Sequence, residues 1–331
     1  MKATIVAPIL LALSSALLAD PTDVVTLRGG TILRGEILSE DGAGVALRVA
    51  PGEVLVLSPK DVSEVKRGVD PDSPPPFLRF REGASTDALQ SGVATYLEPK
   101  SGKLVTLVGA VHVGDAEYFG ALQKLLDGHA VVLYEGVGGG AKAADLEEIS
   151  FVFRLQVEVG RLLGLTFQKD GIDYGREHFR NADMAWPEMK AALEAKGQTL
   201  VPMQGFLRLL SPFLEGLLSS QRAMLERSGR QDAAAADLKR TLGRMLAQGP
   251  ELLERLGIVD SRKRDDVIVS LRNEAAFRVL DKVLEGPERS IAVFYGAAHL
   301  PDMHRRLIER GLSLRSSTFV DAWRIAKRAS K

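Results

Sequence analysis

Apolar and polar residues alternate with a period of two in short stretches over residues 21–68, which is the pattern of half-buried β-strands. A Gly-Gly pair at 29–30 and an Asp-Gly pair at 41–42 interrupt the alternation and are typical turn signals. The pattern predicts about five short antiparallel strands. We expect residues 20–68 to curl into a small all-β barrel, because closing a sheet removes its exposed edges.

Farther along the chain the pattern changes. Residues 104–115, 129–140 and 290–300 contain continuous apolar runs, which indicate strands of a sheet that is covered on both faces. Apolar residues with helical spacing predict helices within 116–126, 144–163, 186–197, 204–228, 232–256 and 262–285, then a final helix after residue 299 and a last strand at 311–320. We therefore predict an α/β main domain over residues 78–331, with a central sheet, covering helices and a helical insertion at 204–256.

Two segments lie outside these domains. Residues 69–77 are rich in proline and are expected to form an extended linker between the two domains. Residues 1–19 begin with a single lysine and continue as an apolar run that ends in small residues, which is typical of a secretory signal cleaved near Ala19. The alternative is an uncleaved anchor, but the run is shorter than the roughly 20 residues that a membrane span prefers. We expect an exported protein, periplasmic or extracellular, with no transmembrane span in the mature chain.

Composition excludes several classes of protein. Hydrophobic residues make up 45% of the 331 positions and charged residues 26%, which is typical of a folded chain and not of a disordered one. The 43 basic and 43 acidic residues balance, so no overall basic field is present to hold nucleic acid. Cysteine is absent. Disulfides, thiolate metal sites and cysteine nucleophiles are therefore excluded, and a transition metal would need histidine and carboxylate ligands.

The candidate chemistry follows the apolar runs. Two of the runs end in the same Gly-x-x-His pattern, which places His112 and His299 just beyond the carboxyl ends of two predicted strands. In open α/β sheets, ligands bind at that edge. Glu135 follows the third run in the same relative place, and a carboxylate there is unfavourable unless it is paired or coordinates an ion. Arg272 precedes a helical apolar stripe; it is either a solvated helix residue or, if it points inward, a group that stabilises an oxyanion.

These segments resemble a known family. The stretches GAVHVGDAEYFGAL at 109–122, VVLYEGV at 131–137, FQKDGIDYGREHFRNADM at 167–184, RNEAAFRVL at 272–280 and VFYGAAHLPDM at 293–303 are similar to the TraB/GumN/TIKI family, which is sometimes grouped with pheromone-shutdown proteins and erythromycin esterases. The resemblance covers about residues 90–320. It departs from the family where Leu300-Pro301-Asp302 follows the second histidine, since a glycine is common there.

The resemblance implies an α/β core and a site formed by His112, Glu135, Arg272 and His299. Some members of the family are proposed to be peptidases that depend on Mn²⁺ or Co²⁺, others are thought to hydrolyse esters, and related proteins bind haem. We therefore expect a metal-dependent hydrolase of peptides or small esters, with a divalent Mn, Co or Zn ion on His112, His299 and Glu135, and with catalytic roles for Glu135 and Arg272. Weaker site candidates are Asp115, Tyr174, Asp183 and Tyr295.

The same residue pattern allows other interpretations. The same residues suit a metal-free esterase-like hydrolase, in which a histidine acts as the base. They also suit a non-catalytic protein that binds haem or a small ligand. The stretch V-x-L-x-x-G-x-x-L-x-G at 25–35 resembles SH3-like or Sm-like barrels, so the N-terminal domain is a possible contact for a protein or the cell wall. Asp115 is an alternative helix N-cap, and His304 is expected to be a solvated helix residue.

Overall fold

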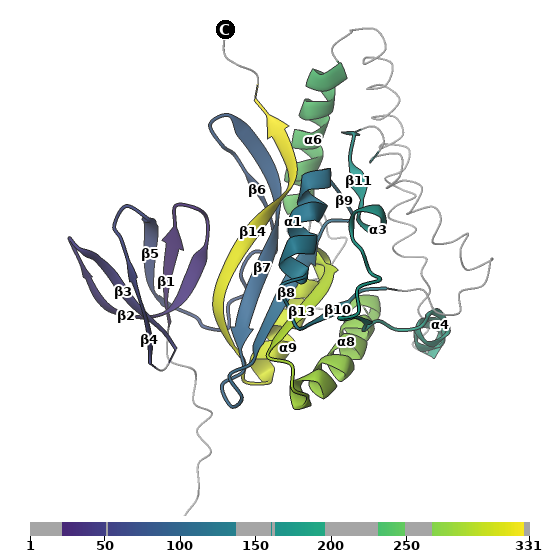
Figure 1. The fold of residues 1–331 in the computed structure, drawn as a ribbon. Coiled ribbons are helices and arrows are strands. Elements are labelled where there is room, and N and C mark those ends of the chain that lie inside the picture. Colours follow the sequence, from purple (N-terminus) through teal and green to yellow (C-terminus); the bar gives the residue numbers. More distant parts are fainter. Residues whose placement is uncertain are drawn as a thin grey trace, which may run out of the picture.

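The structure is a computed structural model that describes residues 22–50, 52–136, 160, 163–195, 231–248 and 267–327. The expected signal segment and the helical stretch predicted at 204–228 lie outside the described residues. Most described strands belong to one large sheet, with the order β12-β10-β13-β8-β7-β14-β2-β1-β5 (Figure 1). Among the described helices, none has the length and apolar character to cross a membrane.

The strands of the main domain are β6 (Leu78–Arg81), β7 (Thr86–Leu97), β8 (Leu104–Ala110), β9 (Val113–Gly114), β10 (Val131–Tyr134), β11 (Thr166–Phe167), β12 (Phe179–Asn181), β13 (Ser290–Gly296) and β14 (Ser313–Ala326). Its helices are α1 (Ala116–Leu126), α3 (Gln168–Gly171), α4 (Trp186–Ala195), α6 (Gln231–Ala247), α8 (Val267–Glu285) and α9 (Leu300–Glu309), with a 3₁₀ turn η1 (Ala297–His299). The expected α/β architecture is therefore confirmed.

The three apolar runs form neighbouring parallel strands, because β13 pairs with β8 on one side and with β10 on the other. Side chains alternate along β13: Val293 packs toward α8 and α9, whereas Phe294 packs toward α1 and α6. Helices thus cover both faces of the sheet, as the continuous apolar runs predict. Two long antiparallel strands, β7 and β14, extend the sheet beyond β8.

The N-terminal unit consists of β1 (Thr22–Leu27), β2 (Ile32–Asp41), β3 (Gly44–Ala50), β4 (Glu53–Leu57) and β5 (Val62–Val69). All of its pairings are antiparallel, in the order β5-β1-β2-β3-β4 around a small apolar core. The expected strands are thus present. The expected barrel is not confirmed, because no pairing of β4 with β5 closes the sheet within the described residues.

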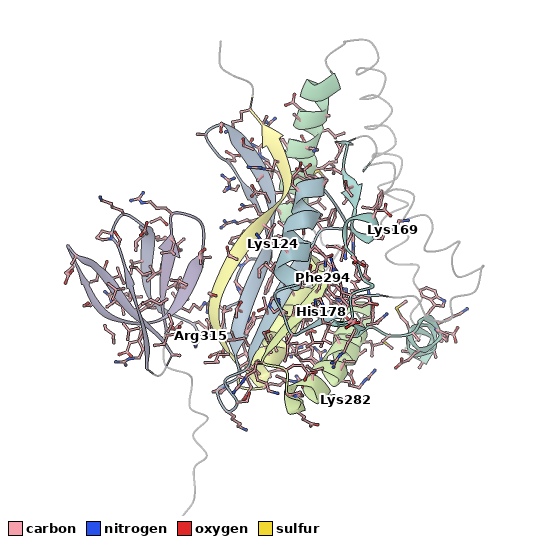
Figure 2. The ribbon with its side chains drawn as sticks, viewed as in Figure 1. Lys124, Lys169, His178, Lys282, Phe294 and Arg315 are labelled. Carbon is pink, nitrogen blue, oxygen red and sulfur yellow. The ribbon has the colours of Figure 1, made fainter. Side chains whose placement is uncertain are left out.

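The N-terminal unit is joined to the main domain by strand pairing as well as by the linker. Strand β2 pairs with β14 through Leu33 and Ser316, and Arg315 Nη2 donates to Glu53 Oε2 at 2.8 Å; Figure 2 labels Arg315 at this junction. The linker itself is anchored, since the Arg34 guanidinium donates to carbonyl oxygens of Pro71 and Ser73 at 3.0 and 2.8 Å.

The expectation that His304 is solvated is wrong. Its side chain is buried between α9 and the linker: Nδ1 lies 2.8 Å from Tyr96 Oη and Nε2 lies 2.9 Å from Asp72 O. A carbonyl oxygen only accepts, so Nε2 carries the proton and Nδ1 accepts from the tyrosine. The pKa of His304 is lowered, mainly because the side chain is buried, and the hydrogen bond to Asp72 O opposes this effect only in part.

We predict that this histidine makes the fold less stable in mild acid. Because its folded pKa is depressed, the unfolded chain binds the proton more readily, and the free energy of unfolding falls as the pH drops below about 6.5. Chemical denaturation should show that the free energy of unfolding falls less between pH 7.5 and pH 5.0 in His304→Gln than in the unsubstituted chain. An equal fall in the two proteins would show that His304 does not cause the acid sensitivity.

Candidate functional site

The expected site residues meet at the carboxyl ends of β8, β10 and β13. His112 follows β8, Glu135 follows β10 directly, and His299 closes the 3₁₀ turn after β13. The register places Gly296 of β13 opposite Ala110 of β8, so the two Gly-x-x-His segments leave the sheet side by side. Parallel pairing therefore brings together residues that are far apart in the sequence, as expected for ligand sites at this edge.

Arg272 is the centre of the ionic contacts. It points inward from α8: its Nη2 lies 2.5 Å from Glu135 Oε1 and 2.6 Å from Asp183 Oδ2, while its Nε donates to Asp183 Oδ1 at 3.0 Å. The side chain is 12% exposed and that of Asp183 is fully buried. The solvated alternative for Arg272 is thus wrong. The carboxylate contacts raise its pKa even though burial alone would lower it.

Asp183 acts as the fixed partner of the arginine. Beyond its two contacts with Arg272, its carboxylate accepts hydrogen bonds from the backbone N–H groups of Gly136 and Met184, at 3.1 and 2.8 Å. Four donors therefore hold one buried carboxylate, which keeps the guanidinium at the ends of the strands even where its contact with Glu135 opens.

Glu135 is an ionised carboxylate in this environment. Burial would raise its pKa, but electrostatic interactions with Arg272, His299 and His112 and the hydrogen bond from the Gly296 N–H to Oε2, at 2.7 Å, together lower the pKa to about 2. A carboxylate with such a pKa is a weak proton acceptor at neutral pH. It is therefore suited to bind a cation, and less suited to act as a general base.

The protonation of His299 is fixed by Asn273, a residue that the sequence analysis did not single out. Asn273 Nδ2 donates to His299 O and to Asp302 Oδ2, at 3.1 and 2.8 Å. Its Oδ1 is then the acceptor for His299 Nδ1 at 2.7 Å. The proton sits on Nδ1, and Nε2 faces Glu135 Oε1 at 3.7 Å and Arg272 Nη1 at 3.4 Å. Asp302, in the segment where the sequence departs from the family, thus supports the histidine.

His112 has an analogous amide partner. Its Nδ1 lies 2.9 Å from Gln168 Oε1, and Gln168 Nε2 donates to Tyr174 Oη at 2.9 Å. Gln168 also donates its backbone N–H to His112 O. The amide oxygen only accepts, so Nδ1 of His112 donates to it, and in the neutral imidazole the lone pair is then on Nε2. Gln168, which is buried on α3, lies in the family-like stretch 167–184, but the sequence analysis did not single it out.

The two tyrosine candidates differ in position. Tyr174 contacts His112 only through Gln168. Its ring packs against Tyr134, Phe179 and Phe294. Figure 2 labels Phe294 in the middle of the main domain. Burial raises the pKa of Tyr174 to about 12. Tyr295 is fully buried, donates to Ala182 O at 3.1 Å and contacts the His299 ring edge-on. Both support the histidines and neither is poised to lose its proton.

Asp115 does not join this cluster. It occupies the N-cap position of α1 but makes no side-chain capping bond. Its carboxylate instead contacts Lys239 Nζ at 3.0 Å and accepts a hydrogen bond from the backbone N–H of Arg324 at 2.6 Å. Helix α6 and strand β14 thus hold its carboxylate, so Asp115 is the N-cap residue of α1 by position, as the alternative expectation has it, and its side chain lies apart from the histidine cluster.

Gly296 leaves room for the site. A Cβ on this residue would lie 3.3 Å from Glu135 Oε2 and 3.6 Å from His112 Nε2. We predict that Gly296→Ala displaces the Glu135 carboxylate, with a loss of about 1 kcal/mol in the free energy of unfolding and a larger relative loss of function. The matched control is Gly120→Ala on α1, where a Cβ meets nothing within 4 Å. Equal free energies of unfolding and equal activities in the two variants would show that Gly296 is not needed to leave room for the Glu135 carboxylate.

The side chains of His112, His299 and Glu135 are chemically suited to bind a divalent ion, provided that the contact between Arg272 and Glu135 opens. Imidazole and carboxylate suit Mn, Co and Zn, and metal-ligating histidines usually donate their second N–H to an oxygen, as His112 and His299 do here. Among the described residues, however, no three His, Asp or Glu side chains stand together as a metal-binding group. Arg272 holds Oε1 of Glu135. An ion on Glu135 therefore requires that contact to open, with Arg272 retained by Asp183.

Comparison of the chain with protein-family models, with curated proteins and with solved structures found no match.

Proposed function

We propose that the chain is an exported, metal-dependent hydrolase of the TraB/GumN type that acts on a peptide or a small ester. The observation that carries the proposal is the pair of imidazoles, each with Nδ1 on a side-chain amide oxygen, next to one ionised carboxylate. His112, His299 and Glu135 would hold the ion. A bound divalent ion lowers the pKa of its water and polarises a carbonyl group.

The chain's own residues have separate parts in this proposal. Gln168 and Asn273 keep the histidine lone pairs on Nε2, and Glu135 supplies a permanent negative charge. Arg272 remains charged at any physiological pH, and Asp183 fixes its Nε edge. When its contact with Glu135 opens, the freed Nη groups are positioned to donate to the substrate oxygen on which negative charge develops.

The test is calorimetric titration of the chain without residues 1–19, using Mn²⁺, Co²⁺ and Zn²⁺. We expect binding of one ion per chain that is lost in His112→Ala and in His299→Ala. His178→Ala is the control, because His178 lies at the other end of β12, near Asp127. Absence of binding to the folded chain would contradict the metal-dependent form.

One contact favours a second candidate, a metal-free esterase-like hydrolase. The buried pair of Arg272 Nη2 and Glu135 Oε1, at 2.5 Å, already satisfies the carboxylate without an ion. In that case His112 or His299 takes the proton from water through Nε2. Ester turnover that persists unchanged in a chelator, and that is lost in the histidine variants, would support this candidate over the first.

A further inference from the structure

A cavity of about 530 Å³ lies between the N-terminal unit and the main sheet, apart from the proposed hydrolytic site. The turn between β1 and β2 forms one wall, and residues of β6, β7, β14 and the first turns of α1 form the others. None of His112, Glu135, Arg272 and His299 lines it. The volume is within the range of small-molecule sites.

The cavity is lined by more positive than negative charge. Four arginines contribute to the walls, from β6, β14 and the β1–β2 turn: Arg28, Arg79, Arg81 and Arg324. The lining carboxylates are Asp115, Glu117 and Asp321, and the first of these is already paired with Lys239.

Asp321 is the carboxylate that faces the arginines most closely, yet it neutralises them poorly. Its Oδ1 accepts from Gln90 Nε2 at 2.6 Å. Its Oδ2 lies 3.9 Å from Arg81 Nη2 and 3.6 Å from Arg324 Nε, distances that are too long for hydrogen bonds. Two guanidinium groups therefore keep donors that the described residues of the cavity leave unfilled.

Arg79 is held in place before any ligand arrives. Its guanidinium lies over the Phe319 ring, 3.3 Å from the centroid, and its Nε donates to Gln90 Oε1 at 2.8 Å. Gly30, with φ of +89°, permits the turn to approach, since a Cβ there would lie 3.0 Å from Nη2. Nη1 and Nη2 make no hydrogen bond within the described residues. They form the fork that matches a carboxylate or a phosphate.

We propose that this cavity binds a small, multiply charged anion, whose carboxylate or phosphate groups meet the Nη edge of Arg79 and the guanidinium groups of Arg81 and Arg324. Arg28 adds a positive charge from the N-terminal unit. The ligand therefore joins the two parts of the chain and should stabilise their contact. The proposal is independent of hydrolysis.

The experiment is calorimetric titration of the chain without residues 1–19 with citrate and with pyrophosphate, at constant ionic strength. We expect one saturable site, with the tighter of the two anions identifying a carboxylate or a phosphate ligand. Arg79→Gln and Arg81→Gln should each weaken binding by about tenfold or more, because each removes a charge-assisted contact. Arg81 is 43% exposed, so its variant should fold even where Arg79→Gln does not.

The control is Arg48→Gln, on β3 of the N-terminal unit, whose side chain is 46% exposed and outside the cavity. Its affinity for the anion should stay within about twofold of the unsubstituted chain, since surface charges contribute little. The proposal is overturned by the absence of saturable binding to the folded chain, or by equal affinity in Arg81→Gln and Arg48→Gln. It is also overturned if His112→Ala abolishes anion binding, since the anion then occupies the hydrolytic site.

Discussion

Replacing Arg272 by alanine is expected to lower the free energy of unfolding by about 3–5 kcal/mol, because it leaves buried charges without a partner. Asp183 is fully buried and Glu135 is 12% exposed, and both lose the guanidinium that holds them. Urea denaturation at pH 7 measures the loss. The matched control is Arg278→Ala, six residues farther along α8, whose side chain is 56% exposed; its expected change is under about 0.5 kcal/mol.

The pH dependence identifies the cause of that loss. In the unsubstituted chain the pKa of Glu135 is lowered from 4.5 to about 2. Its carboxylate therefore contributes stability above about pH 4.5, and this contribution disappears as the pH falls toward 2. Removing Arg272 removes the largest favourable influence on that pKa. The difference in the free energy of unfolding between the unsubstituted chain and Arg272→Ala should thus become smaller from pH 7 to pH 3.5.

Two outcomes would contradict this account of Arg272. One is a loss below about 1 kcal/mol, which would mean that the carboxylates do not depend on the arginine. The other is a failure of Glu135→Gln to recover part of the loss when it is added to Arg272→Ala, since the second substitution removes one of the unpaired charges.

Replacing either histidine of the site by alanine is expected to abolish most hydrolysis, with a fall in kcat of about 10²–10⁴. The metal-dependent form of the proposal requires the Nε2 lone pairs of both His112 and His299, and the metal-free form requires the Nε2 lone pair of the histidine that acts as the base. The measurement is turnover of a panel of peptides and small esters, with and without Mn²⁺. His178→Ala, outside the site, should keep its activity.

The amide partners provide a graded version of the same experiment. Asn273→Leu keeps the imidazole of His299 but removes the acceptor of its Nδ1–H, so the proton is free to move to Nε2. We expect a fall of about 10–100-fold in activity, or in metal affinity where a metal binds. Full activity in Asn273→Leu together with a large loss in His299→Ala would show that the tautomer is not controlled by Asn273.

Much of the main domain followed from local patterns in the sequence. The apolar runs predicted β8, β10 and β13, and helical spacing predicted α1 to its last residue. These patterns are reliable because burial on two faces of a sheet, or on one face of a helix, imposes a period that the residues must follow. The Gly-x-x-His pairs and Glu135 could be placed at strand ends for the same reason.

Other features of the fold and the site depended on contacts between distant segments. Closure of the N-terminal sheet would need β4 to pair with β5, and no such pairing is present among the described residues, whereas β2 pairs with β14 of the main domain. The inward position of Arg272 depends on Asp183, which is 89 residues away in the sequence. No local pattern distinguishes an arginine on a solvated helix from one that is paired inside the protein.

The sequence by itself thus determined the strands, the helices and the edge of the sheet where the candidate chemistry lies, because those depend on the period of the side chains. Only the tertiary structure decided which side chains complete the site. Asn273 and Gln168 orient the histidines, His304 is buried against the linker, and Asp115 turns away to Lys239. The physical reason is that a hydrogen bond or an ion pair depends on distance in space, and the sheet brings together groups that the sequence keeps far apart.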